Sequence, residues 1–128
     1  MKKIIQTNNA PAPIGPYNQA VQFNNILYTS GQIAIDPSTD QLVMDSIENE
    51  TRQVMENLKA VLHEAGFTFG QVVKTSIFIS DMDNFTAINA VYGEYFSNDN
   101  APARETVQVA RLPKDVNVEI SMIAIGHE

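Results

Sequence analysis

The sequence lacks cysteine, and this absence excludes several kinds of chemistry at once. With no cysteine among 128 residues, the chain has no disulfide, no thiolate metal site and no cysteine nucleophile. A chain without disulfides fits a reducing compartment such as the cytosol. Metal binding through histidine is also disfavoured, because His63 and His127 stand alone without the spacing of metal ligands.

Long apolar runs are missing as well. The longest one near the end of the chain is MIAI at residues 122–125, far short of the roughly 20 residues that a membrane-spanning helix needs. The start, MKKIIQTNNAP, has too few apolar residues after its lysines for the core of a secretion signal. We therefore expect a soluble, cytoplasmic protein.

Positive charge is scarce. Eight lysines and arginines stand against 15 acidic residues, which gives a formal net charge of −7. Such a chain repels phosphate backbones on average, so nucleic acid is a poor candidate ligand. The stretch GFTFG at residues 66–70 lacks the lysine and the hydroxyl residue of a phosphate-binding P-loop.

What is present predicts one soluble α+β domain over residues 1–128. A hydrophobic fraction of 44% and a charged fraction of 18% are typical of a globular chain. A chain of this length can bury a real core. Neither a repeat nor a low-complexity segment interrupts the sequence.

The spacing of apolar and turn-forming residues predicts the strands. Residues 10–17 (APAPIGPY), with three prolines, predict an ordered loop. Segments 20–23 and 25–35 predict short strands that join at Asn24 and Asn25. The composition of DPSTDQ, residues 36–41, predicts a turn. Further strands are predicted at 72–79 (VVKTSIFI), 107–109 and 116–122, with a turn at 111–115 (RLPKD).

Two helices are predicted between these strands. Over residues 48–65 apolar side chains recur on one helical face, with Asp45 and Glu48 as a capping box and Gly66 as the stop. Residues 81–96 begin with acidic caps and continue at helical spacing past Gly93. Each helix is long enough to cross between parallel neighbouring strands. We therefore expect a mixed sheet with both helices packed on one face.

The other face of this sheet is expected to need a cover. More apolar surface is predicted there than two helices can bury, contributed by Tyr28, Thr75, Ile77, Ile79, Val107 and Val109. Contact with other subunits would bury it, and a closed cyclic oligomer is the simplest arrangement.

Two charged residues near the end of the chain are the first candidates for chemistry. Arg104 follows residues 101–103 (APA) and opens a predicted strand, and its planar guanidinium suits a carboxylate. Glu119 shares a strand face with Asn117 and Ser121, so it faces either solvent or a cavity between subunits. Residue type alone favours a surface ion pair for the arginine and a solvent-facing position for the carboxylate.

Four further residues carry weaker signals. Tyr17 ends the proline-rich loop, and both it and Ser30 have hydroxyl groups that donate or accept hydrogen bonds. Gly31 allows a ligand to approach the backbone. Asn89 lies in the second predicted helix, where an amide is either solvated or a polar contact to a site. For acyl transfer, Ser30 has no evident His and Asp partners.

Four stretches together resemble the RidA/YjgF family of reactive intermediate (enamine/imine) deaminases: IGPYNQAV, YTSGQIAIDP, VVKTSIFISDMDNFTAINAVYGEYF and APARETVQVARLPKDVNVEI. The resemblance covers nearly the whole chain, and the closing stretch is its most specific part. It implies a chorismate-mutase-like α+β fold that assembles as a homotrimer with sites between subunits. It also implies hydrolysis of 2-iminopropanoate and 2-iminobutanoate to 2-oxo acids and ammonia, without metal or cofactor.

The resemblance also implies a set of site residues and a metabolic setting. The positions that match the family site are Tyr17, Ser30, Gly31, Asn89, Arg104 and Glu119. This chain departs from the family by having Thr106 where cysteine is common and Glu105 where a small hydroxyl residue is common, and both differences bear on substrate preference. The implied functional partners are pyridoxal-phosphate-dependent serine and threonine dehydratases, which release damaging enamines such as 2-aminoacrylate.

The mechanism expected from these residues needs only acid-base chemistry. Arg104 would hold the carboxylate of the substrate, and Glu119 with Thr106 would position a water. Glu119 would take a proton from this water and pass one to the nitrogen, while the backbone near Gly31 orients the imine. Tyr17 would close the pocket, and Asn89 would support it.

Two other functions stay open at this point. The same cleft could bind a 2-oxo acid or an amino acid and signal to another protein without turnover, because a fold does not fix a function. A ribonuclease or translation inhibitor is the third possibility. The net charge counts against it, although Arg104, Arg111 and Lys114 could form a local basic patch.

Overall fold

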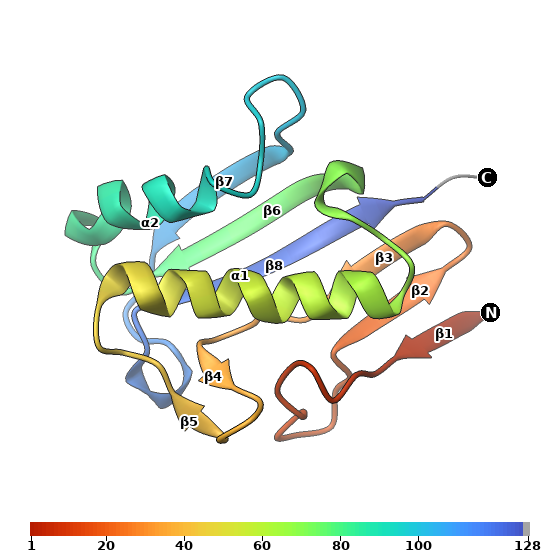
Figure 1. Ribbon diagram of the computed structural model, residues 1–128, viewed down its shortest axis with the longest axis horizontal. Coiled ribbons are helices and arrows are strands. Elements are labelled where there is room, and N and C mark those ends of the chain that lie inside the picture. The colour runs from red at the N-terminus through yellow and green to blue at the C-terminus, as the bar shows by residue number, and fades with distance from the viewer. Residues whose placement is uncertain (127–128) are drawn as a thin grey trace.

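The computed structural model describes residues 1–126, which fold into a six-stranded sheet, a two-stranded sheet and two α-helices (Figure 1). The six-stranded sheet has the order β1-β2-β3-β8-β6-β7. Its strands are β1 (Lys2–Ile5), β2 (Ala20–Phe23), β3 (Ile26–Thr29), β6 (Val72–Ile79), β7 (Ala103–Gln108) and β8 (Val118–Ile125). The small sheet pairs β4 (Ile35–Asp36) with β5 (Gln41–Leu42), and the helices are α1 (Ile47–Glu64) and α2 (Phe85–Tyr92). His127 lies outside the described residues.

The strand directions follow from how the helices connect them. Neighbouring strands are antiparallel except β6 and β7, which are parallel and are joined through α2, as predicted. The connection through α1 differs from the prediction of parallel neighbours. Strands β3 and β6 both run antiparallel to β8, which lies between them. The last strand of the chain therefore enters the middle of the sheet.

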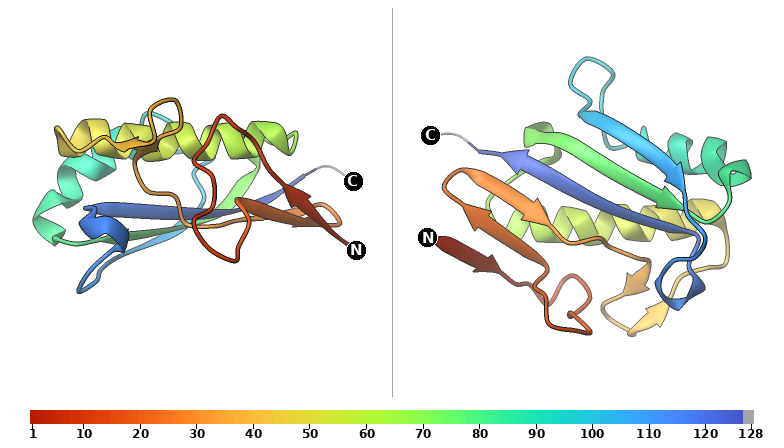
Figure 2. Two further views of the ribbon diagram at one scale, coloured as in Figure 1. Left: turned by 90° about the horizontal axis from the view of Figure 1, so that it is seen from below. Right: turned by 180° about the vertical axis from the view of Figure 1, so that it is seen from behind.

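Both helices cover the same face of the six-stranded sheet, and the opposite face is left uncovered (Figure 2). The core between helices and sheet includes Val54, Met55 and Leu58 of α1, all at 0% exposure, against Ile120 of β8, also at 0%. The predicted α+β class with two helices on one face of a mixed sheet is thus confirmed. Neither helix in residues 1–126 is long and apolar enough to cross a membrane.

The prediction for the uncovered face is only partly correct. Tyr28 and Val107 are exposed on this face, at 47% and 40%. Thr75, Ile77 and Ile79, however, are buried under the helices. Strand β6 has apolar residues of both parities, so its sequence does not tell which face is covered, and a bulge between Val72 and Lys74 shifts the register.

The hairpin and the boundaries of α1 follow the sequence closely. Asn24 takes the left-handed backbone conformation, with φ 54°, between β2 and β3. The cap of α1 is not Asp45 with Glu48: the Ser46 hydroxyl accepts from Asn49 N at 3.0 Å. Gly66 ends the helix as predicted, with φ +81°.

Helix α2 is shorter than predicted. It ends at Tyr92, and Tyr95 and Phe96 lie in the turn after it instead of continuing the helix. Their rings still join the core, because both pack edge-on against Phe69 with ring centroids 5.3 Å apart. Gly93 lowers helix propensity at this point, and the aromatic spacing that suggested a helix reflects packing in the turn.

The strand predicted over residues 25–35 is interrupted. Strand β3 ends at Thr29, and Ser30 and Gly31 are irregular. Contact with β8 returns at Gln32 as an isolated antiparallel bridge, in which the Gln32 N–H donates to Ile120 O at 2.8 Å and the Gln32 carbonyl accepts from Ile120 N at 3.2 Å. The interruption places Ser30 and Gly31 beside β8, next to Glu119.

Candidate functional site

A cavity of about 400 Å³ on the uncovered side of the sheet brings together four of the predicted site residues. Its lining consists of Ile14, Tyr17, Ser30, Gly31, Ile33, Pro113 and Glu119. These residues come from the proline-rich loop, the break after β3, the turn before β8 and β8 itself. The structure thus brings Tyr17, Ser30, Gly31 and Glu119, four of the residues singled out from the sequence, together within one chain.

Glu119 is the acidic residue of this cavity, and its carboxyl group is partly removed from solvent. It lies on β8 opposite Phe78 of β6, and its side chain is partly buried. Burial raises the pKa of its carboxyl above the ordinary value for glutamate, and no neighbouring charge or hydrogen bond from residues 1–126 opposes this rise. A carboxyl group with a raised pKa is better suited to act first as a base and then as an acid, because its pKa lies nearer the pH at which the reaction runs.

Gly31 is required at its position because the Glu119 side chain lies where a larger residue would begin. A Cβ on Gly31 would overlap the Glu119 carboxylate oxygen, and it would come within 2.8 Å of Glu119 Cδ and 3.0 Å of Cγ. The sequence suggested that this glycine allows a ligand to approach the backbone. The structure shows that it first makes room for the carboxylate itself.

Replacing Gly31 by alanine should therefore move Glu119. We expect Gly31→Ala to displace the carboxylate from the cavity and to lower the pKa of Glu119 toward its ordinary value, as seen by a ¹³C NMR titration of the carboxyl. Gly15→Ala is the matched control, because a Cβ there would meet only two Tyr17 ring carbons at an ordinary 3.6 Å. An unchanged Glu119 titration in Gly31→Ala would contradict this role.

A buried glutamine holds the loop that carries Tyr17. Gln19 is 2% exposed. Its Oε1 accepts from Thr7 N at 2.7 Å, and its Nε2 donates to the carbonyls of Thr7, Ala10 and Pro11 at 3.0, 3.2 and 2.8 Å. Sequence reasoning missed this residue, because a glutamine between a loop and a strand carries no periodic signal.

The break after β3 is fixed to the same loop. Ser30 N donates to Gln19 O at 2.9 Å, and Ser30 Oγ donates to Asn18 O at 2.5 Å. The hydroxyl of Ser30 is thus engaged with the backbone of the loop. We infer that Ser30 shapes the cavity by connecting its two walls.

A second cavity, of about 420 Å³, contains the other predicted charged residue. Its lining is formed by the end of α2, the turn after it and the start of β7, with the residues Asn89, Tyr92, Gly93, Phe96, Asn98, Ala101, Pro102 and Arg104. Asn89 and Arg104, both predicted as site residues, therefore also lie together.

Asn89 and two aromatic rings orient the guanidinium of Arg104. Arg104 Nη1 donates to Asn89 Oδ1 at 2.7 Å. Arg104 Cζ lies 5.0 Å from the ring centroid of Tyr92 and 5.7 Å from that of Phe85, within the range of cation–π attraction. Among the described residues no carboxylate lies within ion-pair distance of Arg104. The remaining N–H groups can therefore donate two parallel hydrogen bonds to a bound carboxylate.

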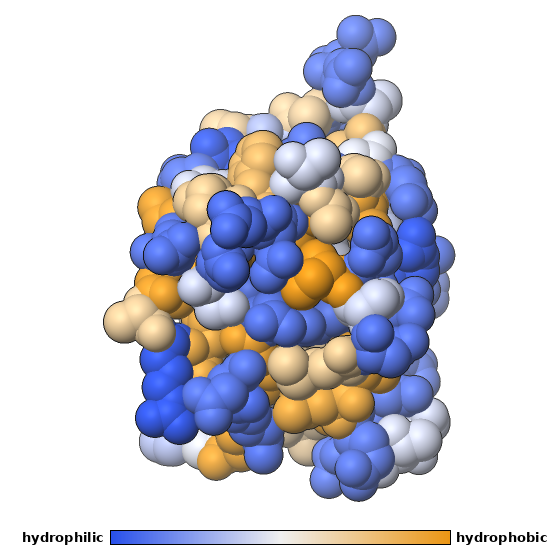
Figure 3. Space-filling model, turned by 90° about the vertical axis from the view of Figure 1, so that its left-hand side faces the viewer, coloured by the Kyte–Doolittle hydropathy of each residue, from blue (hydrophilic) through white to orange (hydrophobic). Residues whose placement is uncertain are grey.

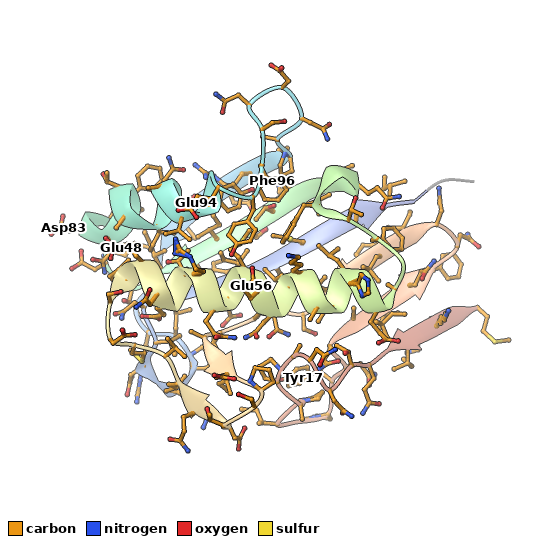
Figure 4. All side chains as sticks on the ribbon, viewed as in Figure 1. Tyr17, Glu48, Glu56, Asp83, Glu94 and Phe96 are labelled. Atoms are coloured by element: carbon orange, nitrogen blue, oxygen red, sulfur yellow. The ribbon has the colours of Figure 1, made fainter. Side chains whose placement is uncertain are left out.

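The two cavities are separate within one chain. Arg104 pairs in register with Thr75 of β6, whereas Glu119 pairs with Phe78, three residues further along the same strand. Because side chains alternate along a strand, Arg104 lies on the face covered by the helices and Glu119 on the uncovered face. In Figure 4, Tyr17 of the first cavity and Phe96 of the second lie on opposite sides of α1. The prediction that Arg104 and Glu119 meet around one cavity is thus not met by a single chain.

The two departures from the family pattern fall on different faces. Thr106 pairs with Ile77, so it shares the face of Arg104, and its buried Oγ1 has no hydrogen-bond partner in residues 1–126. It cannot position a water together with Glu119 of the same chain. Glu105 lies on the uncovered face, where it accepts from Lys74 Nζ at 2.6 Å and from the Ser76 hydroxyl. These two hydrogen bonds, with Lys74 first, lower the pKa of Glu105.

Residues 1–126 contain no group of three or more His, Cys, Asp or Glu side chains placed to hold an ion. The chemistry available to the two cavities is that of a guanidinium, a carboxyl group with a raised pKa, hydroxyls and backbone amides.

Comparison with known proteins places this arrangement in a family. A family model described as Endoribonuclease L-PSP matches residues 7–126. A RutC family protein of Synechocystis is 55% identical over 124 residues, 96% of this chain and 95% of that protein. The 2-iminobutanoate/2-iminopropanoate deaminase of Salmonella typhimurium is 47% identical over 127 residues, 98% of each chain. TdcF of Escherichia coli, solved with bound serine, has a TM-score of 0.92 and 42% identity, and covers 98% of this chain and 99% of its own. The chain therefore belongs to the RidA/YjgF family, which is also described as endoribonuclease L-PSP.

Proposed function

We propose that this protein hydrolyses reactive 2-imino acids, such as 2-iminopropanoate and 2-iminobutanoate, to 2-oxo acids and ammonia. The observation that carries the proposal is the pair of cavities. One holds a carboxyl group with a raised pKa and no partner among residues 1–126, and the other holds an oriented guanidinium with free donors. These are the two groups that a small electrophilic carboxylate needs. The Salmonella relative named as such a deaminase supports the same assignment.

The proposal requires that the two cavities come from different copies of the chain. Within one chain they open on opposite faces of the sheet, so Arg104 of one copy would meet Glu119 of another. The uncovered sheet face supports such an assembly, because Tyr28, Val107 and Ile125 are 47%, 40% and 42% exposed there. We propose a homotrimer, the assembly that the family resemblance implies, with three equivalent sites at its boundaries.

In this assembly Arg104 would bind the carboxylate of the substrate. The planar guanidinium, held by Asn89 and stacked on Tyr92, would form two parallel hydrogen bonds and so fix the C=N carbon in place. The serine bound by TdcF carries the same carboxylate next to a nitrogen-bearing carbon. Thr106 lies on the same face as Arg104, but its hydroxyl oxygen is buried, so no contact with the substrate is assigned to it.

Glu119 of the second copy would carry the protons. It would remove a proton from a water that adds to the C=N carbon and pass a proton to the nitrogen, so that a C–O bond forms as the C=N π bond opens and a tetrahedral amino alcohol results. It would then take the proton of the new hydroxyl and deliver a proton to the amine nitrogen, so that the C–N bond breaks and ammonia leaves as the C=O bond forms. Gly31 would keep the carboxylate in position, and Tyr17 would close the cavity.

A coupled assay tests the proposal directly. Purified protein added to a threonine dehydratase reaction should accelerate the disappearance of the imine and the release of ammonia. Light scattering on the same sample should give about three times the 14.1 kDa of one chain. An unchanged rate of imine loss, with the oligomer intact, would refute the deaminase function.

A metabolite sensor is the second candidate function. The serine bound by TdcF has no C=N bond, so this relative binds an amino acid that an imine hydrolase would not consume. Saturable binding of 2-oxobutanoate without ammonia release from imine would favour this alternative over the enzyme.

A ribonuclease function has less support in this chain. Beyond the net charge of −7, Arg111 is engaged with Asp115, through Nε to Oδ1 at 2.6 Å and Nη2 to Oδ2 at 3.2 Å. The local positive charge near the turn before β8 is thereby reduced. Salt-sensitive RNA binding and cleavage by the trimer would restore this alternative.

A further inference from the structure

Helix α1 carries a fully buried carboxylate that is hydrogen-bonded to the residue before β8. Glu50 of α1 is 0% exposed. Its Oε2 accepts from Asn117 N and its Oε1 from Asn117 Nδ2, both at 2.8 Å. No cation in residues 1–126 forms an ion pair with it. Burying a carboxylate is costly unless its oxygens are hydrogen-bonded, so the single residue Asn117 compensates the burial of Glu50.

Asn117 connects three elements at one end of the sheet. It directly precedes β8, and besides its bonds to α1 it contacts the residue after β6: Ser80 N donates to Asn117 O at 3.1 Å, and Ser80 Oγ donates to Asn117 Oδ1 at 3.3 Å. This end of the molecule, where β6 ends and β8 begins, faces the viewer in Figure 3, and hydrophobic and hydrophilic surface alternate across it. The chain therefore enters β8 through a residue that is held from two sides.

The turn before Asn117 contains two residues in an unfavourable backbone conformation, so contacts at its end are needed to hold it. Lys114 and Asp115 have φ of 55° and 58°, a left-handed conformation that is unfavourable for residues other than glycine. Pro113 of the same turn lines the Glu119 cavity. A strained turn relaxes when its anchor is lost, and a slip of one residue in β8 would move Glu119 to the other face of the sheet.

We propose that Glu50 is a positioning residue for the reaction, acting through Asn117 to fix the register of β8 and the place of Glu119. Asn117 directly precedes β8, and only Val118, itself 0% exposed, separates it from Glu119 along the chain. A small displacement of Asn117 therefore reaches the carboxylate that the proposed mechanism uses. The inference rests on the proposed imine hydrolysis.

The contact between Glu50 and Asn117 can be tested by exchanging its carboxylate and amide groups, because the exchange reverses donor and acceptor without changing side-chain size. Asn117→Asp sets a second carboxylate against Glu50, and we expect kcat for imine hydrolysis to fall by about 10-fold or more while KM changes by less than about 3-fold. The double variant Glu50→Gln with Asn117→Asp restores a donor facing an acceptor, and it should recover kcat to within about 3-fold of the wild type.

Two further measurements separate positioning from stability. The pH midpoint of kcat should shift in Asn117→Asp and return in the double variant, whereas the destabilised core variant Val61→Ala should keep the wild-type midpoint. If Asn117→Asp does not fold, Glu50→Met, which keeps the size but removes both acceptors, should show the same loss of kcat and the same shift.

The outcomes are distinguishable from failure of the proposed function. A wild-type midpoint in Asn117→Asp or Glu50→Met, with only thermal stability lowered, would overturn the positioning role. So would a double variant that does not recover kcat. If the wild type itself does not hydrolyse imines, the function fails, and a ¹³C titration of the Glu119 carboxyl in the same variants still decides whether Glu50 positions it.

Discussion

Glu119→Gln should lower the turnover of 2-imino acids by about 10²–10⁴-fold, the usual contribution of general acid-base catalysis. The amide keeps the size and the position beside Gly31 but cannot take a proton from water. KM should change little, because Arg104 supplies most of the contact with the substrate. Steady-state kinetics of ammonia release measures both constants, and full activity in this variant would remove Glu119 from the proposed proton transfer.

The same variant gives a prediction for the dependence on pH. Burial raises the pKa of Glu119, and the base must be deprotonated, so kcat of the wild type should rise with pH through this raised value. The folded state favours the protonated carboxyl. Its contribution to stability is therefore complete below the ordinary glutamate pKa of about 4.3 and is lost as pH rises through the raised pKa. Glu119→Gln should thus melt at a higher temperature than the wild type near neutral pH and show a smaller difference in acid.

Mixing two inactive variants should restore activity. In Arg104→Met the guanidinium is lost, and in Glu119→Gln the carboxylate is lost, so each homotrimer is expected to be nearly inactive. If every site takes Arg104 from one subunit and Glu119 from the next, random exchange at equal amounts leaves about one quarter of the sites with both groups intact. We expect about a quarter of the wild-type rate after exchange, measured by imine hydrolysis.

The control for this experiment is a chain that carries both substitutions. Mixed with Glu119→Gln, it supplies no intact carboxylate and should restore nothing. Exchange itself can be followed by mass spectrometry of differently labelled trimers. Mixed trimers that form but stay inactive would show that sites are not shared between neighbouring subunits.

Sequence reasoning identified the chemistry of the site better than its geometry. The periodicity of α1 and the hairpin at Asn24 were readable, because local spacing and turn propensity determine them. Arg104 and Glu119 were found as candidates by type and by family resemblance. Their placement on opposite faces depends on how β7 and β8 pair with β6, and such pairing between distant segments leaves no local signal.

The supporting residues were missed for a related reason. Glu50 stands in the first turn of a helix, where an acidic residue normally faces solvent and interacts with the helix dipole, so its burial was not foreseen. Gln19 acts through contacts with distant segments. Gly31 was named as a site residue, but its role in making room for Glu119 also depends on a distant segment and was not foreseen. The cap of α1 was misplaced by one position, because Asp45 and Ser46 are both good capping residues and only the backbone decides between them.

Because Arg104 and Glu119 lie on opposite faces of one chain, the activity of the protein should depend on its concentration. If the reaction needs both groups, a newly synthesised, solitary chain has no complete reactive centre. Specific activity should then fall once the protein is diluted below the dissociation constant of the oligomer, and it should show a lag when diluted protein is concentrated again. Control over imine hydrolysis would thus lie partly in the amount of protein that the cell makes.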